Sequence, residues 1–74
     1  MTETLMNLRG LKCPLPALRV RKKLSGLKTG DLIVAECTDP LAMIDIPNLL
    51  RETGDTLEDK SEAGGVFIFR IRKK

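Results

Sequence analysis

The segment Leu32–Cys37 constrains the fold of this chain more than any other stretch. Its sequence, Leu-Ile-Val-Ala-Glu-Cys, is nearly all apolar and partly β-branched, which is typical of a central strand. A turn-forming segment at residues 28–31 precedes it, and Asp39-Pro40 follows it as a helix-start signal. A strand of this kind needs neighbouring strands at its edges and a covering layer on its face.

A segment with helical periodicity precedes this strand. Within Pro14–Ser25 and just beyond it, apolar residues recur at spacings of three and four; they are Ala17, Val20, Leu24 and Leu27. The basic residues Arg19, Lys22 and Lys23 lie off this stripe, and Gly26 is a plausible C-cap. The pattern predicts an amphipathic helix that packs one side against the sheet.

A second helix should follow the strand, but Pro47 complicates where it starts. A proline inside a helix costs about 3 kcal/mol, whereas a proline in the first turn removes only an N–H that has no partner. We therefore expect a turn over residues 39–44 and a main helix capped by Asp45, with Pro47 in its first turn. Gly54 should end this helix.

The remaining segments predict three more strands. Residues 4–8 read as a short first strand, residues 56–62 as a polar edge strand, and Val66–Arg72 as a strictly alternating strand. Ala63-Gly64-Gly65 is a hairpin turn between the last two. The predicted fold class is α/β, as an α+β two-layer sandwich of order βαβαββ. Its four-stranded mixed sheet carries both helices on one face.

Length and composition limit what such a chain can do. Its 74 residues suffice for one domain, expected to span 1–74, that buries only about 60% of the unfolded surface. The sequence has two cysteines and no histidine, so a zinc site would lack two ligands and histidine-assisted catalysis is absent. No apolar run approaches a membrane span, and the start does not resemble a secretory signal. We expect a cytoplasmic monomer with reduced thiols and no metal.

The segment Cys13-Pro14-Leu15-Pro16 carries the clearest chemical signal. It lies where a loop enters the first helix, so backbone N–H groups and the positive helix end should lower the pKa of the Cys13 thiol. Lys12 and Arg9 add positive charge nearby. Pro14 and Pro16 fall where a helix start tolerates proline, and they stiffen the backbone beside the sulfur.

These residues give the chain a resemblance to a known family, the TusA-like (SirA/TusA) sulfur carriers. The marks of the resemblance are Leu8-Arg9-Gly10-Leu11-Lys12-Cys13-Pro14-Leu15-Pro16, Gly30-Asp31, Thr38-Asp39-Pro40, Asp45-Ile46-Pro47 and Gly54. The resemblance implies a βαβαββ fold and a persulfide carried on Cys13, supported by Gly10, Lys12 and the two prolines. It implies a sulfurtransferase-like carrier without a cofactor, which takes sulfur from a cysteine desulfurase or rhodanese and passes it to an acceptor protein cysteine.

The family serves transfer-RNA thiolation, molybdenum-cofactor maturation and sulfur oxidation, and the sequence leaves the pathway open. Two positions differ from the transfer-RNA branch. Leu15 stands where an acidic residue is common, and Asp55 stands where a histidine is frequent. Both differences leave the pathway undecided, Leu15 also bears on the choice of partner, and neither removes the cysteine.

Several residues have more than one interpretation. Cys37 shares strand parity with core residues, which favours a packing role over that of a resolving thiol paired with Cys13. Asp39 and Asp45 are interpreted mainly as helix caps, although the carboxyl end of a parallel strand would also bring them near the cysteine loop.

The basic cluster of Arg19, Lys22 and Lys23 is interpreted as a docking surface for acidic partner proteins, against the alternative of a solvated helix face. From residue 4 to residue 30 the chain has seven basic residues and no acid. Two other function classes stay open: a small nucleic-acid-binding or regulatory module, and a thiol redox switch that uses Cys13 and Cys37. With 3% aromatic residues and no evident stacking platform, we do not expect direct nucleic-acid binding.

Overall fold

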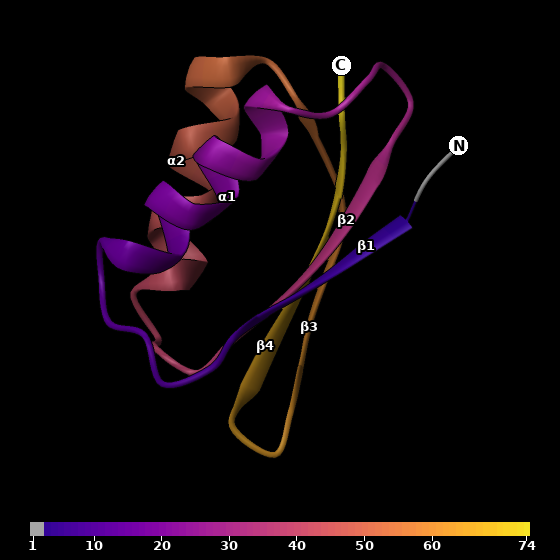
Figure 1. Ribbon diagram of the computed structural model, residues 1–74. Coiled ribbons are helices and arrows are strands. Elements are labelled where there is room, and N and C mark those ends of the chain that lie inside the picture. Colours follow the sequence, from indigo (N-terminus) through magenta and orange to yellow (C-terminus); the bar gives the residue numbers. More distant parts are fainter. Residues whose placement is uncertain (1–2) are drawn as a thin grey trace.

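The helices and strands follow one another in the predicted order, β-α-β-α-β-β, in a computed structural model that describes residues 3–74 (Figure 1). The elements are β1 (Glu3–Leu8), α1 (Leu15–Ser25), β2 (Leu32–Cys37), α2 (Ala42–Thr53), β3 (Thr56–Ala63) and β4 (Val66–Arg72). The bounds of β2 and β4 are those expected from the sequence, and the other strands begin or end one residue away. The predicted fold class is therefore confirmed.

The four strands form one mixed sheet in the order β1-β2-β4-β3. Strand β2 lies inside the sheet, as its apolar sequence predicts; it pairs in parallel with β1 and antiparallel with β4. Strand β3 pairs antiparallel with β4 at the far edge, with a register shift between Leu57 and Asp59. Both helices cover the same face of this sheet, which gives the expected two layers (Figure 1).

The core lies between the helices and the covered face of the sheet. Its fully buried members include Val20 from α1, Ile46 from α2, Ile33 from β2, and Phe69 and Ile71 from β4. Burying an aliphatic or aromatic side chain of this size contributes about 1.5–3 kcal/mol each. The alternating residues Phe69 and Ile71 of β4 therefore point into the core, as the sequence predicts.

The start of α2 differs from the prediction. The helix begins at Ala42 with Leu41 as its N-cap residue, so Asp45 is not the cap and Pro47 lies inside the helix. The Asp39 carboxylate accepts a hydrogen bond from the Leu41 N–H at 3.0 Å, which organises the turn earlier than expected. Because Ala42 and Ile46 are both buried against the core, their packing together offsets the cost of placing Pro47 inside the helix.

The helix ends agree with the sequence. Gly26 is the C-cap residue of α1, and Gly54 ends α2 in the left-handed conformation with φ of 83°. The Gly54 N–H donates to the Leu50 carbonyl at 2.8 Å, which satisfies one of the last carbonyls of the helix. Within residues 3–74, neither helix is both long and apolar enough to cross a bilayer.

Candidate functional site

The loop that carries Cys13 lies at the carboxyl end of β1. Because β1 and β2 are parallel, with Leu8 opposite Cys37, the loops that leave these two strands emerge at the same end of the sheet. A hydrogen bond joins them: the Gly10 N–H donates to the Thr38 hydroxyl oxygen at 2.8 Å. The β1–α1 loop is therefore held against the β2–α2 segment.

Two carboxylates from the β2–α2 segment contact Cys13. The Cys13 backbone N–H donates to Asp39 Oδ2 at 2.7 Å, and the Cys13 thiol donates to Asp45 Oδ2. Cys13 is exposed to solvent. The structure thus presents an accessible sulfur whose backbone and side chain are each fixed by one acid from a distant part of the chain.

These acids reverse the expected effect on the thiol. The hydrogen bond to Asp45 raises the pKa of the Cys13 thiol above its ordinary value, with a smaller contribution from desolvation, and the negative charges of Asp45 and Asp39 act in the same direction. The expectation of a lowered pKa was wrong because a carboxylate, rather than helix N–H groups, faces the sulfur. One N–H group at this helix start, that of Leu15, donates to the Lys12 carbonyl at 2.8 Å instead of to the sulfur.

The two carboxylates have different partners. Asp39 accepts hydrogen bonds from the backbone N–H groups of Cys13 and Leu41, and these lower the pKa of its carboxyl group, the bond from Cys13 more strongly. The positive charge of Lys12 lowers this pKa further. Asp39 therefore holds the loop as an anion. Arg9, expected to act on the thiol, instead lies 3.6 Å from a Glu36 carboxylate oxygen and hydrogen-bonds Asn7.

The two prolines lie at the start of α1, close to where the sequence places them. Pro14 is the N-cap residue, and Pro16 lies in the first turn, where its missing N–H removes no helical hydrogen bond. The Pro16 side chain is fully buried, whereas Pro14 is exposed. Pro16 therefore anchors the segment in the core while Cys13 stays at the surface.

Two surface hollows are lined by the residues that precede and follow Cys13 in the chain and by the two acids that contact it. One, of about 290 Å³, is lined by Gly10, Leu11, Lys12, Thr38, Asp39 and Pro40. Another, of about 200 Å³, lies between the helices and is lined by Pro14, Ala17, Leu18, Arg21, Asp45, Asn48, Leu49 and Glu52. Exposed apolar side chains lie nearby in the chain, with Leu15 44% and Ile44 59% exposed. An open apolar and charged surface of this kind suits contact with another protein.

Cys37 has the opposite environment. It is 0% exposed in β2, and burial, together with the charge of Asp39, raises the pKa of its thiol to about 11. Both cysteines are free thiols. The prediction that Cys37 belongs to the core is confirmed.

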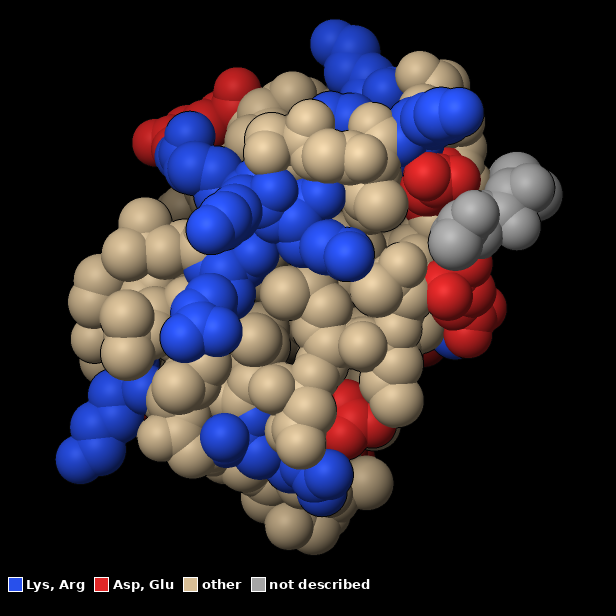
Figure 2. Space-filling model, in the orientation of Figure 1, with Lys and Arg blue, Asp and Glu red and all other residues tan. Residues whose placement is uncertain are grey.

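The structure does not bring the basic cluster into the hollows beside Cys13. Arg19, Lys22 and Lys23 are exposed on α1 and line a separate hollow beside β1. Figure 2 shows basic side chains gathered in a band over this side of the molecule. Among residues 3–74, no group of three or more potential ligands could hold a metal ion.

Comparisons with known proteins point to one family. The family model described as "Sulfurtransferase TusA" matches residues 4–73. A Neisseria meningitidis protein, named as a candidate sulfur carrier, is 39% identical over the full length of both chains. The sulfur carrier protein TusA of Allochromatium vinosum is 39% identical over 86% of this chain and 84% of its own. That of Pseudomonas paraeruginosa is 32% identical over 97% and 91%. The chain belongs to the TusA family of sulfur carriers.

Proposed function

We propose that this protein carries sulfur as a persulfide on Cys13, receiving it from a donor protein and passing it to an acceptor cysteine. The observation that carries the proposal is the fixed and exposed position of the Cys13 sulfur at the start of α1, where the backbone is held by Asp39 and anchored by Pro16. A group that exchanges an atom with other proteins must be reachable and must return to one position between encounters.

The transfer balances without an added oxidant. The Cys13 thiol loses its proton, and the resulting thiolate attacks the outer sulfur of a donor persulfide. The new bond joins Cys13 Sγ to that sulfur, the donor's own sulfur–sulfur bond breaks, and the donor leaves as a thiolate that takes up a proton. Passing the sulfur to an acceptor cysteine repeats this exchange with Cys13 as the leaving group.

Asp45 sets a condition on the first step. Because its hydrogen bond and charge favour the protonated thiol, Cys13 is a weak nucleophile while this contact lasts. A partner that places a positive charge beside Asp45, or displaces it from the sulfur, would favour the thiolate. This arrangement couples activation of the sulfur to contact with the partner.

The partner classes follow from the family. A cysteine desulfurase or a rhodanese would supply the persulfide, and an acceptor protein with a reactive cysteine would receive it. The destination is one of the family's pathways: transfer-RNA thiolation, molybdenum-cofactor maturation or sulfur oxidation. The proposed setting is the cytoplasm, where such thiols stay reduced.

Intact-mass analysis tests the proposal. After incubation with a persulfide donor and no reductant, the protein should gain ~32 Da, the mass of one sulfur atom, and lose it on reduction. The Cys13→Ala variant should gain nothing, whereas Cys37→Ala should load normally. Loading of Cys13→Ala at the normal level would contradict the role of Cys13.

A further inference from the structure

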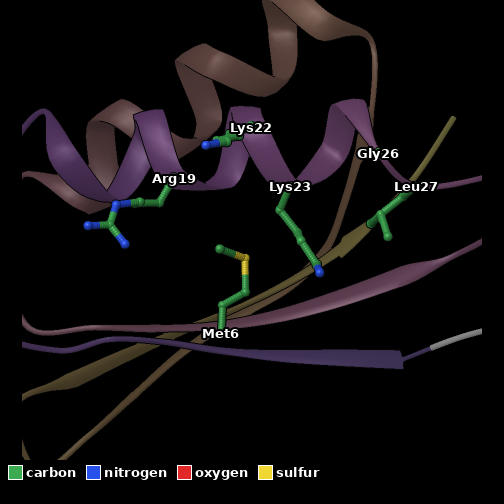
Figure 3. Close-up of a pocket in the computed structure, with 6 residues that line it drawn as sticks. All are labelled: Met6, Arg19, Lys22, Lys23, Gly26 and Leu27. Atoms are coloured by element: carbon green, nitrogen blue, oxygen red, sulfur yellow. The ribbon is translucent and has the colours of Figure 1, made fainter.

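A third hollow lies along α1, apart from those beside Cys13. It measures about 300 Å³ and is lined by Met6, Arg19, Lys22, Lys23, Gly26 and Leu27; we call it the basic groove. Met6 rises from β1 toward the helix, while Arg19 and Lys23 extend from α1 into the same space (Figure 3). Met6 and Leu27 are partly buried and pack against the core. The groove therefore combines an apolar floor with a cationic rim.

The rim carries charge that the protein itself does not neutralise. Within the described part of the chain, the side chains of Arg19, Lys22 and Lys23 form no hydrogen bond or ion pair. Arg21 on the same helix is different, because its guanidinium lies 2.6 Å from the Glu52 carboxylate of α2. Three adjacent unpaired cations create a positive field that an external anion can occupy without displacing an internal partner.

We propose that the basic groove is the docking site for an acidic segment of a partner protein. An apolar side chain of that segment lies against Met6 and Leu27, and its carboxylates pair with the basic rim. This inference rests on the proposed function, since it gives the partner of a sulfur carrier a second point of contact. Lys23 lies eight residues after the start of α1, about 12 Å along the helix axis, so one partner can contact the groove and Cys13 together.

Charge and chemistry favour this occupant over two others. A second copy docked about a two-fold axis, the commonest symmetry of protein dimers, would bring its own cations to the groove, and like charges at an interface repel. Single-stranded RNA binds through exposed aromatic side chains as well as cations, but Phe69 is fully buried and Phe67 is packed against the core.

The neighbouring strand adds a second mode of contact. Over residues 3–74, strand β1 lies at the edge of the sheet with β2 as its only partner, and it carries Met6 into the groove. An extended segment laid along a free strand edge gains main-chain hydrogen bonds, while its alternate side chains reach adjacent pockets. The acidic segment that the groove fits best is therefore an extended one.

A peptide titration followed by NMR tests the inference. The probe is the end-blocked peptide Asp-Glu-Leu-Glu-Asp, added to isotope-labelled protein at low salt. We expect the largest amide shifts at Met6, Arg19 and Leu27, and weaker binding as salt is raised. The double variant Arg19→Glu/Lys23→Glu should weaken binding at least about tenfold.

The matched control is Arg51→Glu/Lys60→Glu, which changes the net charge equally at two exposed positions outside the groove. This control should keep binding within about twofold, since distant surface charges are screened. Equal losses in the two double variants would overturn the inference, because the peptide would then sense only net charge. Equal affinity for a peptide with glycine in place of leucine would overturn the role of the apolar floor.

Two further outcomes would assign the groove to another occupant and so refute the proposal. Tighter binding of a single-stranded RNA of equal charge would favour nucleic acid, and concentration-dependent shifts without peptide would favour a second copy. Peptide binding needs no thiol, so Cys13→Ala should bind the peptide normally. A failure of sulfur loading and a failure of docking can therefore be told apart.

Discussion

Replacing Cys13 with alanine leaves Cys37 as the only thiol and tests whether this second cysteine can take part in the chemistry. Cys37 is 0% exposed, and burial raises its pKa to about 11 from an ordinary value of 9.0. Because the thiolate is the reacting species, a pKa about two units higher lowers the reactive fraction about a hundredfold near pH 8. Burial adds a further delay, because a reagent reaches the sulfur only when the fold opens locally.

The assay is alkylation of Cys13→Ala by iodoacetamide, followed by intact mass in native buffer and in concentrated guanidinium chloride. We expect the native rate to be at least about a hundredfold below the denatured rate. Cys37→Ala serves as the companion variant, and its exposed Cys13 should react in native buffer faster than Cys37 reacts in Cys13→Ala. Native alkylation of Cys37 within about tenfold of the denatured rate would refute this reasoning and revive a two-cysteine redox switch.

Two further perturbations test the site and the fold. Asp45→Asn replaces the carboxylate whose hydrogen bond, and to a lesser extent whose charge, raises the pKa of the Cys13 thiol. In a Cys37→Ala background the pH profile of alkylation should therefore move to lower pH, and an unmoved profile would show that Asp45 does not control ionisation. Gly54→Ala places a Cβ on a residue with a φ of 83° and within 3.2 Å of the Lys74 side chain. This change should lower the free energy of unfolding in urea by about 1 kcal/mol. An unchanged midpoint would contradict the strain argument.

The sequence predicts the sheet well because its strongest patterns coincide with its tertiary environment. The apolar run of β2 indicates a strand buried on both sides, and the alternation of β4 indicates a strand with one buried face. Both are in fact the inner strands of the sheet. The start of α2 was less predictable. Local preference disfavours Pro47 in a helix, but the burial of Ala42 and Ile46 against the core decides the outcome, and burial depends on the whole fold.

The candidate site was only half predictable for a related reason. The motif around Cys13 places the sulfur near a helix start, but the residues that govern its ionisation lie 26 and 32 positions away, at Asp39 and Asp45. Their position after a parallel strand was a signal that they come near the loop. Which carboxylate faces the sulfur, and which faces the backbone, depends on side-chain geometry that spacing does not encode.

The hydrogen bond from Cys13 to Asp45 distinguishes an empty carrier from a filled one. On the proposed function, the incoming sulfur replaces the thiol hydrogen through which Cys13 donates a hydrogen bond to Asp45. Any remaining proton sits on the outer sulfur, about 2 Å beyond Cys13 Sγ. Loading Cys13 with sulfur therefore frees the Asp45 carboxylate and leaves its negative charge beside the bound sulfur. The donor protein thus meets a carrier whose Asp45 is bound to the thiol, and the acceptor protein meets one whose Asp45 is free. This difference lets each of them distinguish the carrier without sulfur from the loaded one.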